Sequence, residues 1–176
     1  MCVFQMFSHI SGAHVNSAVT IAALIMGKID IITFQFYIVA QCLGALVGYG
    51  LLWALLGITA ESPQILYCHT TIFMVTEVQA LFIEFIATML LCLAVSGLWD
   101  ENNDNRGDSI PIKIGLILTG LIIATANYTG ASFNTFRSLA PAVFYNEWEH
   151  HWIYWVGPNL GGALGALIYR FLLQSK

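Results

Sequence analysis

Two short stretches place an asparagine among small and hydroxyl-bearing residues in parts of the chain that carry few charges. They are SGAHVNSAV at 11–19 and TGASFNTFR, which begins at Thr129, with the asparagines at Asn16 and Asn134. An asparagine amide both donates and accepts hydrogen bonds. The pattern therefore indicates hydrogen bonding to neutral groups. No acid–base pair or nucleophile set accompanies it, so an enzyme is not expected.

The composition predicts that a membrane surrounds the elements that hold these residues. Of the 176 residues, 58% are hydrophobic and 9% are charged, and the mean hydropathy is +0.75. A soluble domain has about a quarter of its residues charged. We therefore expect an all-α integral membrane protein, with one domain over 1–176 and no cofactor. The six lysines and arginines are scattered and make no basic patch for nucleic acid, and the four cysteines show no metal-ligand spacing.

Four apolar runs are long enough to cross a bilayer as helices. They lie at about 32–57, 78–99, 112–128 and 152–173. Polar or turn-forming loops are expected between them, at 59–78 and 100–108. Arg137 lies in the connection between the last two spans, and a misplaced ionisable residue of this kind predicts a functional site.

The remaining basic residues predict the orientation. If the four spans alternate, five basic residues fall on one side, namely Lys28, Arg106, Lys113, Arg170 and Lys176. The positive-inside rule makes that side cytoplasmic.

The two asparagine stretches belong to an internal repeat. SGAHVNSAV aligns with TGASFNTFR at an offset of 118, and YIVAQCLGALVG at 37–48 aligns with YWVGPNLGGALG, 117 residues later. Gly44 and Gly48 then pair with Gly161 and Gly165, and small residues spaced in this way favour close helix packing. An odd number of crossings in each half predicts inverted repeats, which are typical of membrane transport folds.

The first repeat, 1–58, is shorter than the second, 79–174. The second repeat holds two spans before its asparagine stretch, whereas only a short segment precedes Asn16 in the first. The partner of the first of these spans (helix 1 of the repeat) and most of the partner of the second (helix 2) are therefore missing from the first repeat. We expect the 176-residue form to be a truncated or shortened protein.

The segments and their order resemble the aquaporin, or major intrinsic protein, family. They are HISGAHVNSAVT at 9–20, YIVAQCLGA at 37–45, Glu84, YTGASFNTFRSLAPAV at 128–143 and HWIYWVGPNLGGALGALIY at 151–169. The resemblance implies an aquaporin-like inverted repeat with two re-entrant half-helices, each of which follows an Asn-Pro-Ala loop. Both motifs depart from that pattern here, because they are Asn16-Ser17-Ala18 and Asn134-Thr135-Phe136.

The resemblance places the two asparagines at the midpoint of a pore. Asn16 and Asn134 would cap the half-helices, whose N-termini carry partial positive charge. Their amides would also donate to a passing water, which interrupts the hydrogen-bonded chain that protons follow. The alternative is that both asparagines only cap helices.

The altered motif positions raise a question of packing. Ser17 and Thr135 stand where the family has prolines that pre-set the first helical turn, but both tolerate a helix start, so the half-helices should persist. Phe136 stands where the family has alanine at the contact of the half-helices. Its ring should spread that contact, at a cost of about 1–3 kcal/mol, or turn toward a neighbouring helix.

The resemblance also implies an outer selectivity filter made of Ile122, Ala131 and Arg137, with its helix 2 member missing. Isoleucine stands where water-selective members carry histidine, which favours small uncharged solutes such as glycerol or urea. Four other positions match the water-channel pattern, namely Ser138, Ala142, Tyr154 and Trp155. Water is therefore the first candidate, and glycerol or urea is the second.

Two further groups of residues follow from the resemblance. Pore-lining backbone is expected at Gly12, Ala13, His14, Gly130 and Ser132. Gln41 and Glu84 are expected to support the two loops through hydrogen bonds to the loop backbone. Irregular backbone is tolerated at membrane depth where it lines such a cavity.

The predicted function is a passive transmembrane channel for water or a small neutral solute, with no metal and no catalysis. The alternative is a non-conducting, truncated or structural membrane protein with the same fold. The resemblance implies a homotetramer in a lipid bilayer, and the plasma membrane is the expected location.

Overall fold

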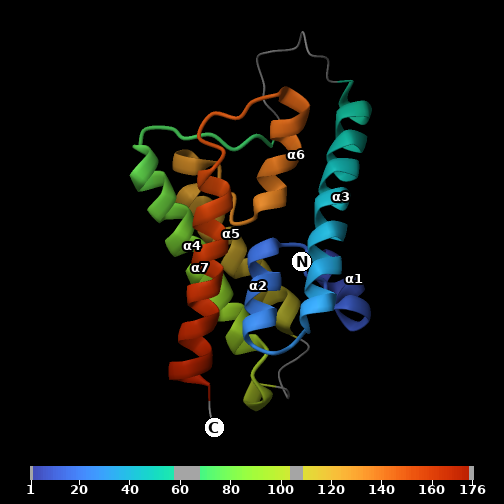
Figure 1. Ribbon diagram of the computed structural model, residues 1–176, viewed down its shortest axis with the longest axis vertical. Helices are drawn as coiled ribbons and strands as arrows, with labels where there is room; N and C mark the ends of the chain where they lie inside the picture. Colours follow the sequence, from blue (N-terminus) through green and yellow to red (C-terminus); the bar gives the residue numbers. More distant parts are fainter. Residues whose placement is uncertain (1, 58–67, 104–108, 175–176) are drawn as a thin grey trace.

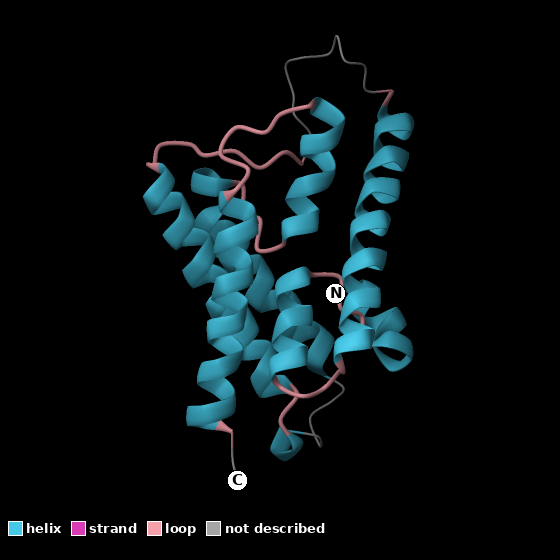
Figure 2. Cartoon of the chain, in the orientation of Figure 1, coloured by secondary structure: helices cyan, strands magenta, loops and turns pink. Residues whose placement is uncertain are grey.

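The computed structural model describes residues 2–57, 68–103 and 109–174, and these contain helices and loops but no strands (Figure 2). Four helices have the length and hydropathy of membrane spans: α3 Ile31–Leu56, α4 Glu77–Leu98, α5 Ile110–Thr129 and α7 Ile153–Ile168, continued by a π-helix over Tyr169–Leu173. Three are shorter: α1 Cys2–Ser11, α2 Ser17–Ile25 and α6 Thr135–Tyr145. The prediction of an all-α, multi-pass membrane protein with four spans is confirmed. The predicted loops at 59–78 and 100–108 lie partly outside the described residues.

Local sequence accounts for where the spans begin and end. Asp30 accepts a hydrogen bond from the Thr33 N–H at 2.8 Å at the start of α3, and Gly57 ends that helix with φ of 60°. Thr76 and Gln79 form a capping box at the start of α4. The start of α5 carries Pro111, whose missing N–H costs nothing in a first turn.

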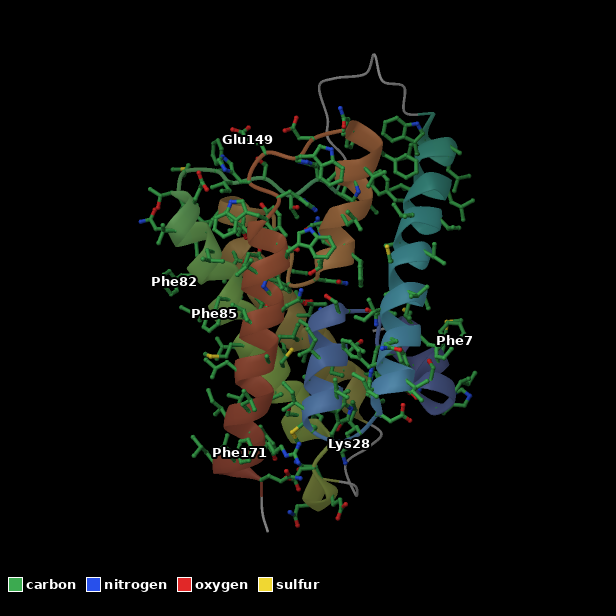
Figure 3. All side chains as sticks on the ribbon, in the orientation of Figure 1. Phe7, Lys28, Phe82, Phe85, Glu149 and Phe171 are labelled. Atoms are coloured by element: carbon green, nitrogen blue, oxygen red, sulfur yellow. The ribbon has the colours of Figure 1, made fainter. Side chains whose placement is uncertain are left out.

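The short helices α2 and α6 begin near the middle of the molecule and run toward opposite ends (Figure 1). Lys28, just beyond α2, lies toward one end, and Glu149, beyond α6, lies at the other (Figure 3). Two half-helices that diverge from a shared centre are what the inverted repeat predicts. The cytoplasmic assignment of the Lys28 end stays a prediction, and Arg106 and Lys176, which also supported it, lie outside the described residues.

The closest helix contact in the described chain joins α4 to α7, and glycines make it possible. A Cβ added at Gly157 would lie 2.9 Å from the Glu84 Cβ. At Gly161 it would overlap the Phe85 carbonyl, and at Gly165 the Met89 carbonyl. The expected packing role of the glycines in α7 is therefore confirmed.

The glycines of the first repeat behave differently. Gly44 and Gly48 of α3 are exposed, and a Cβ added at either would meet no described atom within 4 Å. The prediction that these two glycines pack closely against another helix is thus wrong for the described residues. The physical reason is that α3 stands at one side of the bundle with little of its surface covered (Figure 1).

This difference between repeats gives a matched pair of substitutions. Gly161→Ala should destabilise the protein by at least about 1–3 kcal/mol, because the new methyl group displaces backbone of α4. Gly44→Ala, at the equivalent position of the first repeat, should be neutral or stabilise by up to about 1 kcal/mol, since alanine is the better helix former. Thermal unfolding of both variants in detergent measures the difference. Equal unfolding temperatures would contradict the packing described here.

Candidate functional site

The two half-helices start in the same way. Asn16 and Asn134 are their N-caps, with extended backbones at φ −147° and −156°. The Asn16 Oδ1 accepts from the Ala18 N–H at 2.9 Å, and the Asn134 Oδ1 accepts from the Phe136 N–H at 3.1 Å. Both altered motifs therefore still form capped helices, because neither Ser17 nor Thr135 prevents a helix from starting.

The same two asparagines join the repeats to each other. The Asn16 Nδ2 donates to the Phe133 carbonyl at 2.8 Å, and the Asn134 Nδ2 donates to the Val15 carbonyl at 2.8 Å. The Ser17 N–H also points to the Asn134 Oδ1, at 3.4 Å. An amide has two N–H groups. After one such bond each asparagine keeps a second N–H that could donate to a small molecule.

The loops before these caps share an unusual backbone. Gly12 and Gly130 have φ of 71° and 74°, and the alanines that follow them, Ala13 and Ala131, have φ of 51° and 50°. Phe133 has φ of 53°. A residue with a side chain costs roughly 1–2 kcal/mol in this left-handed region, so the surrounding structure has to hold the conformation.

A buried carboxylate holds the second loop. Glu84 of α4 is fully buried. Its Oε1 accepts from the Thr129 hydroxyl at 2.7 Å and the Ser132 N–H at 2.9 Å, and its Oε2 accepts from the Phe133 N–H at 2.8 Å. The two oxygens together satisfy three donors of a loop that has no helical or sheet partners.

An amide holds the first loop. The Gln41 Nε2 of α3 donates to the His14 carbonyl and to the Thr20 hydroxyl, the latter at 2.7 Å. The Thr20 hydroxyl in turn donates to the Asn16 carbonyl at 3.0 Å. The first loop is thus tied by one of its carbonyls to α3, whereas the second loop is tied by its N–H groups to α4.

The His14 side chain lies between two aromatic rings. Its ring centroid is 5.1 Å from that of Tyr37 and 5.3 Å from that of Trp99. The residue is buried, and its Nδ1 has no hydrogen-bond partner among the described residues. The histidine therefore packs as part of the loop and keeps one nitrogen for an unassigned partner.

A cavity of about 280 Å³ brings most of the expected site residues together. It lies between α1, α4, α5 and the two loops. Of the expected residues it is lined by Ala13, Asn16, Ile122, Ala131, Ser132, Asn134 and Arg137. Both half-helix caps and all three expected filter residues thus face one space.

Arg137 is held at this cavity by backbone carbonyls. One guanidinium nitrogen donates to the Cys68 carbonyl at 2.6 Å and the other to the Gly130 carbonyl at 3.3 Å. The arginine therefore connects the segment before α4, at Cys68, to the second loop. Its remaining N–H groups could serve a bound or passing oxygen.

A second, larger cavity of about 1000 Å³ lies on the α3 side of the loops. Of the expected residues it is lined by Ala13, His14, Gln41, Asn134, Phe136 and Arg137. Asn134 and Arg137 border both cavities. The described helices therefore leave the two loops open toward α3 as well as toward α5.

Phe136 does not point into the smaller cavity. It is buried, and its ring meets the Trp155 ring of α7 edge to face, with centroids 6.3 Å apart and an interplanar angle of 82°. Of the two arrangements anticipated from its size, the ring adopts the one in which it turns toward a neighbouring helix.

Several expected residues line neither large cavity. Gly12 lines a separate pocket next to Trp99, and the others are Ser17, Ala18, Thr135, Gly130 and Glu84. Some of them support residues that line the cavities: Glu84 bonds to the Phe133 N–H, and the Gly130 carbonyl accepts from Arg137.

Sequence reasoning did not assign a supporting role to three polar residues that hold the site. Thr129 bonds to Glu84, and Thr20 bonds to Gln41. Asn159 of α7 bonds to both Ser17 and Thr135. The sequence signal that could have revealed them is a polar residue within an otherwise apolar segment. This signal is clearest for Asn159, because the equivalent position of the first repeat is Cys42.

Comparison with known proteins identifies the family of this architecture. The sequence profile described as "Major intrinsic protein" matches residues 1–169. The chain belongs to the major intrinsic protein family. Aquaporin-4 of Notomys alexis is 38% identical, with 96% of this chain aligned to 51% of that protein, and the lens fiber major intrinsic protein of Lithobates pipiens is 40% identical, with 98% aligned to 65%. The chain spans only about half the length of these aquaporin-4 relatives.

A solved structure supports the same assignment. The aquaglyceroporin of Plasmodium falciparum superposes with a TM-score of 0.84 at 26% sequence identity, covering 94% of this chain and 75% of the other. The aquaporin-like fold inferred from the ordered motifs is thus confirmed.

The role of Glu84 can be tested in isolation. Glu84→Gln replaces one acceptor oxygen by an NH₂ group that faces a backbone N–H, which should cost about 1–3 kcal/mol. Hydrogen exchange at the Ser132 and Phe133 amides should then accelerate. Glu77→Gln, in the same helix but half exposed, is the control and should leave these amides unchanged. Unaltered protection in Glu84→Gln would refute the support role.

Two histidines at the end of the molecule that holds Glu149 are expected to make the stability depend on pH. Burial lowers the pKa of His69. The charge of Glu147 and a hydrogen bond with its backbone partly oppose this shift, and the charge of Arg137 makes a smaller contribution that lowers the pKa. Burial also lowers the pKa of His151, and the charge of His69 adds to the effect. Both folded-state values lie below the ordinary 6.5, so the unfolded chain binds protons first as the pH falls.

We therefore expect stability to be full above pH 6.5 and to decline as the pH drops below that value. Thermal unfolding across a pH series should show this decline in the unmodified protein and a flatter profile in the His69→Gln/His151→Gln variant. His9→Gln, at an exposed position of α1, is the control and should keep the original profile. An unchanged slope in the double variant would rule out this origin.

Proposed function

We propose that the protein is a passive membrane channel whose first candidate solute is water. The observation that supports this most is the single cavity lined by both half-helix caps, Asn16 and Asn134, together with Arg137. Each asparagine keeps a free N–H after its cross-bond, and the helix N-termini add partial positive charge. Such a site orients a neutral oxygen-bearing molecule and disfavours cations and protons.

Small neutral solutes such as glycerol or urea are the second candidates for the same path. Ile122 lines the same cavity as Arg137 with an apolar side chain, and Ala131 adds little bulk there. An apolar wall beside the guanidinium donors of Arg137 suits glycerol, which has both CH and OH groups. The same donors could bind the carbonyl oxygen of urea. The match to the Plasmodium aquaglyceroporin is compatible with this choice, and the matches to aquaporin-4 and lens major intrinsic protein are compatible with water.

A non-conducting, structural role for the chain is the second candidate function, and one observation favours it. Asn134 and Arg137 also border the larger cavity toward α3, so the described helices do not by themselves enclose a single-file path. In this alternative the two asparagines serve only as helix caps and cross-links.

We further propose that the chain assembles as a homotetramer in the plasma membrane. The support is the family membership and the large apolar surface that α3 leaves uncovered, with Phe36, Val47 and Leu55 among its exposed side chains. Lipid tails or a second copy of the chain would cover this surface.

Vesicle swelling tests the proposed function. Purified protein in lipid vesicles should accelerate osmotic water flow above that of empty vesicles. Ile122→His should lower the permeability to glycerol or urea relative to water, because it narrows the filter and adds a polar ring. Stopped-flow light scattering measures both.

Arg137→Ala is the control for the filter, and it should raise the leak of larger solutes or protons. Water flow at the level of empty vesicles in the unmodified chain would support the structural alternative and exclude conduction by this form.

A further inference from the structure

Helix α7 contacts every altered position of the two motifs. Ser17 and Thr135, the first residues of α2 and α6, both bond to Asn159, and the Phe136 ring packs on Trp155, one turn earlier. Gly162 completes the contact, because a Cβ added there would lie 2.9 Å from the Ala18 Cβ. One face of a single helix therefore carries both half-helix starts.

Asn159 uses both N–H groups and its amide oxygen in hydrogen bonds to neighbouring groups. Its Oδ1 accepts from the Ser17 hydroxyl at 3.0 Å. Its Nδ2 donates to the Thr135 hydroxyl oxygen at 3.0 Å and to the Trp155 carbonyl at 2.9 Å. The Thr135 hydroxyl in turn donates a hydrogen bond to the Tyr154 carbonyl at 3.0 Å.

This set has only one orientation. A flipped Asn159 amide would place its oxygen against the Trp155 carbonyl, which is an acceptor only, and would leave two donors without partners. Ser17 and Thr135 are buried, so water does not readily replace a lost bond. The amide therefore holds both hydroxyls at fixed positions on α7.

Position N1 of a helix is where proline fixes the backbone best. Serine and threonine there leave the first turn free to vary unless a side-chain contact restrains it. Each of these residues directly follows a capping asparagine, so a shift of Ser17 or Thr135 would move Asn16 or Asn134.

We propose that Asn159 is a positioning residue that clamps the two half-helix starts to α7 and so sets the separation of the Asn16 and Asn134 amides. The clamp exists once, and not once in each repeat, since the repeat partner of Asn159 is Cys42, a free thiol on α3. Its effect on permeation rests on the proposed function, but its effect on the half-helices does not.

The test is hydrogen exchange at the Ala18 and Phe136 amides, which the two asparagines cap. Asn159→Leu should accelerate exchange at both sites by about tenfold or more, because both half-helix starts lose a buried bond. The same substitution in a Ser17→Pro/Thr135→Pro background should change neither site, since proline then fixes both first turns. A general loss of packing would appear in both backgrounds.

Thr135→Val serves as a second variant if Asn159→Leu does not fold. It keeps the shape of the side chain, removes its hydroxyl and should accelerate exchange at Phe136, whereas Thr135→Ser should not. Unchanged exchange in Asn159→Leu, or an equal increase in the proline background, would overturn the clamp.

Vesicle swelling separates this inference from the proposed function. If the unmodified protein conducts, Asn159→Leu should reduce water flow severalfold, and the proline background should restore it. A conducting protein whose Asn159→Leu variant swells like the original would count against the clamp. If the unmodified protein does not conduct, the channel proposal fails while the exchange result still decides the clamp.

Discussion

The structure depends on satisfying the polar backbone of two irregular segments at membrane depth. Where lipid replaces water, an unpaired N–H or carbonyl costs several kcal/mol. Glu84 meets this need for the second loop, and it reaches Ser132 and Phe133 from α4. Glu84 also lies at the contact of α4 with α7, where the missing Cβ of Gly157 makes room for it. Close packing and loop support are therefore parts of one arrangement.

The two repeats solve the same backbone problem with different chemistry. Gly12 and Ala13 adopt nearly the same left-handed conformations as Gly130 and Ala131. The second loop offers N–H groups and meets a carboxylate. The first offers a carbonyl and meets the Gln41 amide, a donor. The two loops can share one backbone shape and still have different supporting side chains. The backbone conformation sets where the N–H and carbonyl groups point, and either a donor or an acceptor side chain can bind them.

The architecture could be predicted well from the sequence, because hydropathy marks spans and the repeat marks the half-helices. Less could be predicted about which faces are covered. Gly44 and Gly161 occupy equivalent positions in similar patterns, yet only Gly161 meets another helix. Small residues at this spacing allow a second helix to approach closely, but they do not predict whether a second helix is present.

The site shows the same limit. The amides of Asn16 and Asn134 were recognisable from their place in the motifs, and the loop supports Gln41 and Glu84 followed from the resemblance. The supporting role of Asn159 could not be predicted, since a single asparagine in an apolar span does not indicate which residues it will bond to. The direction of the Phe136 ring was also open, because Trp155 decides it from a distant part of the chain.

Replacing proline by serine and threonine changes which interactions make the two half-helix starts rigid. Proline restricts the backbone in the folded and unfolded states alike, so its contribution is local. A hydrogen bond to Asn159 exists only when α7 is in place, and α7 is positioned by the glycines that face α4. The two asparagine caps are therefore coupled to the α4–α7 contact, through α7 on one side and through Glu84 on the other. A disturbance of that contact would loosen both half-helices together, which a pair of proline-based motifs would resist.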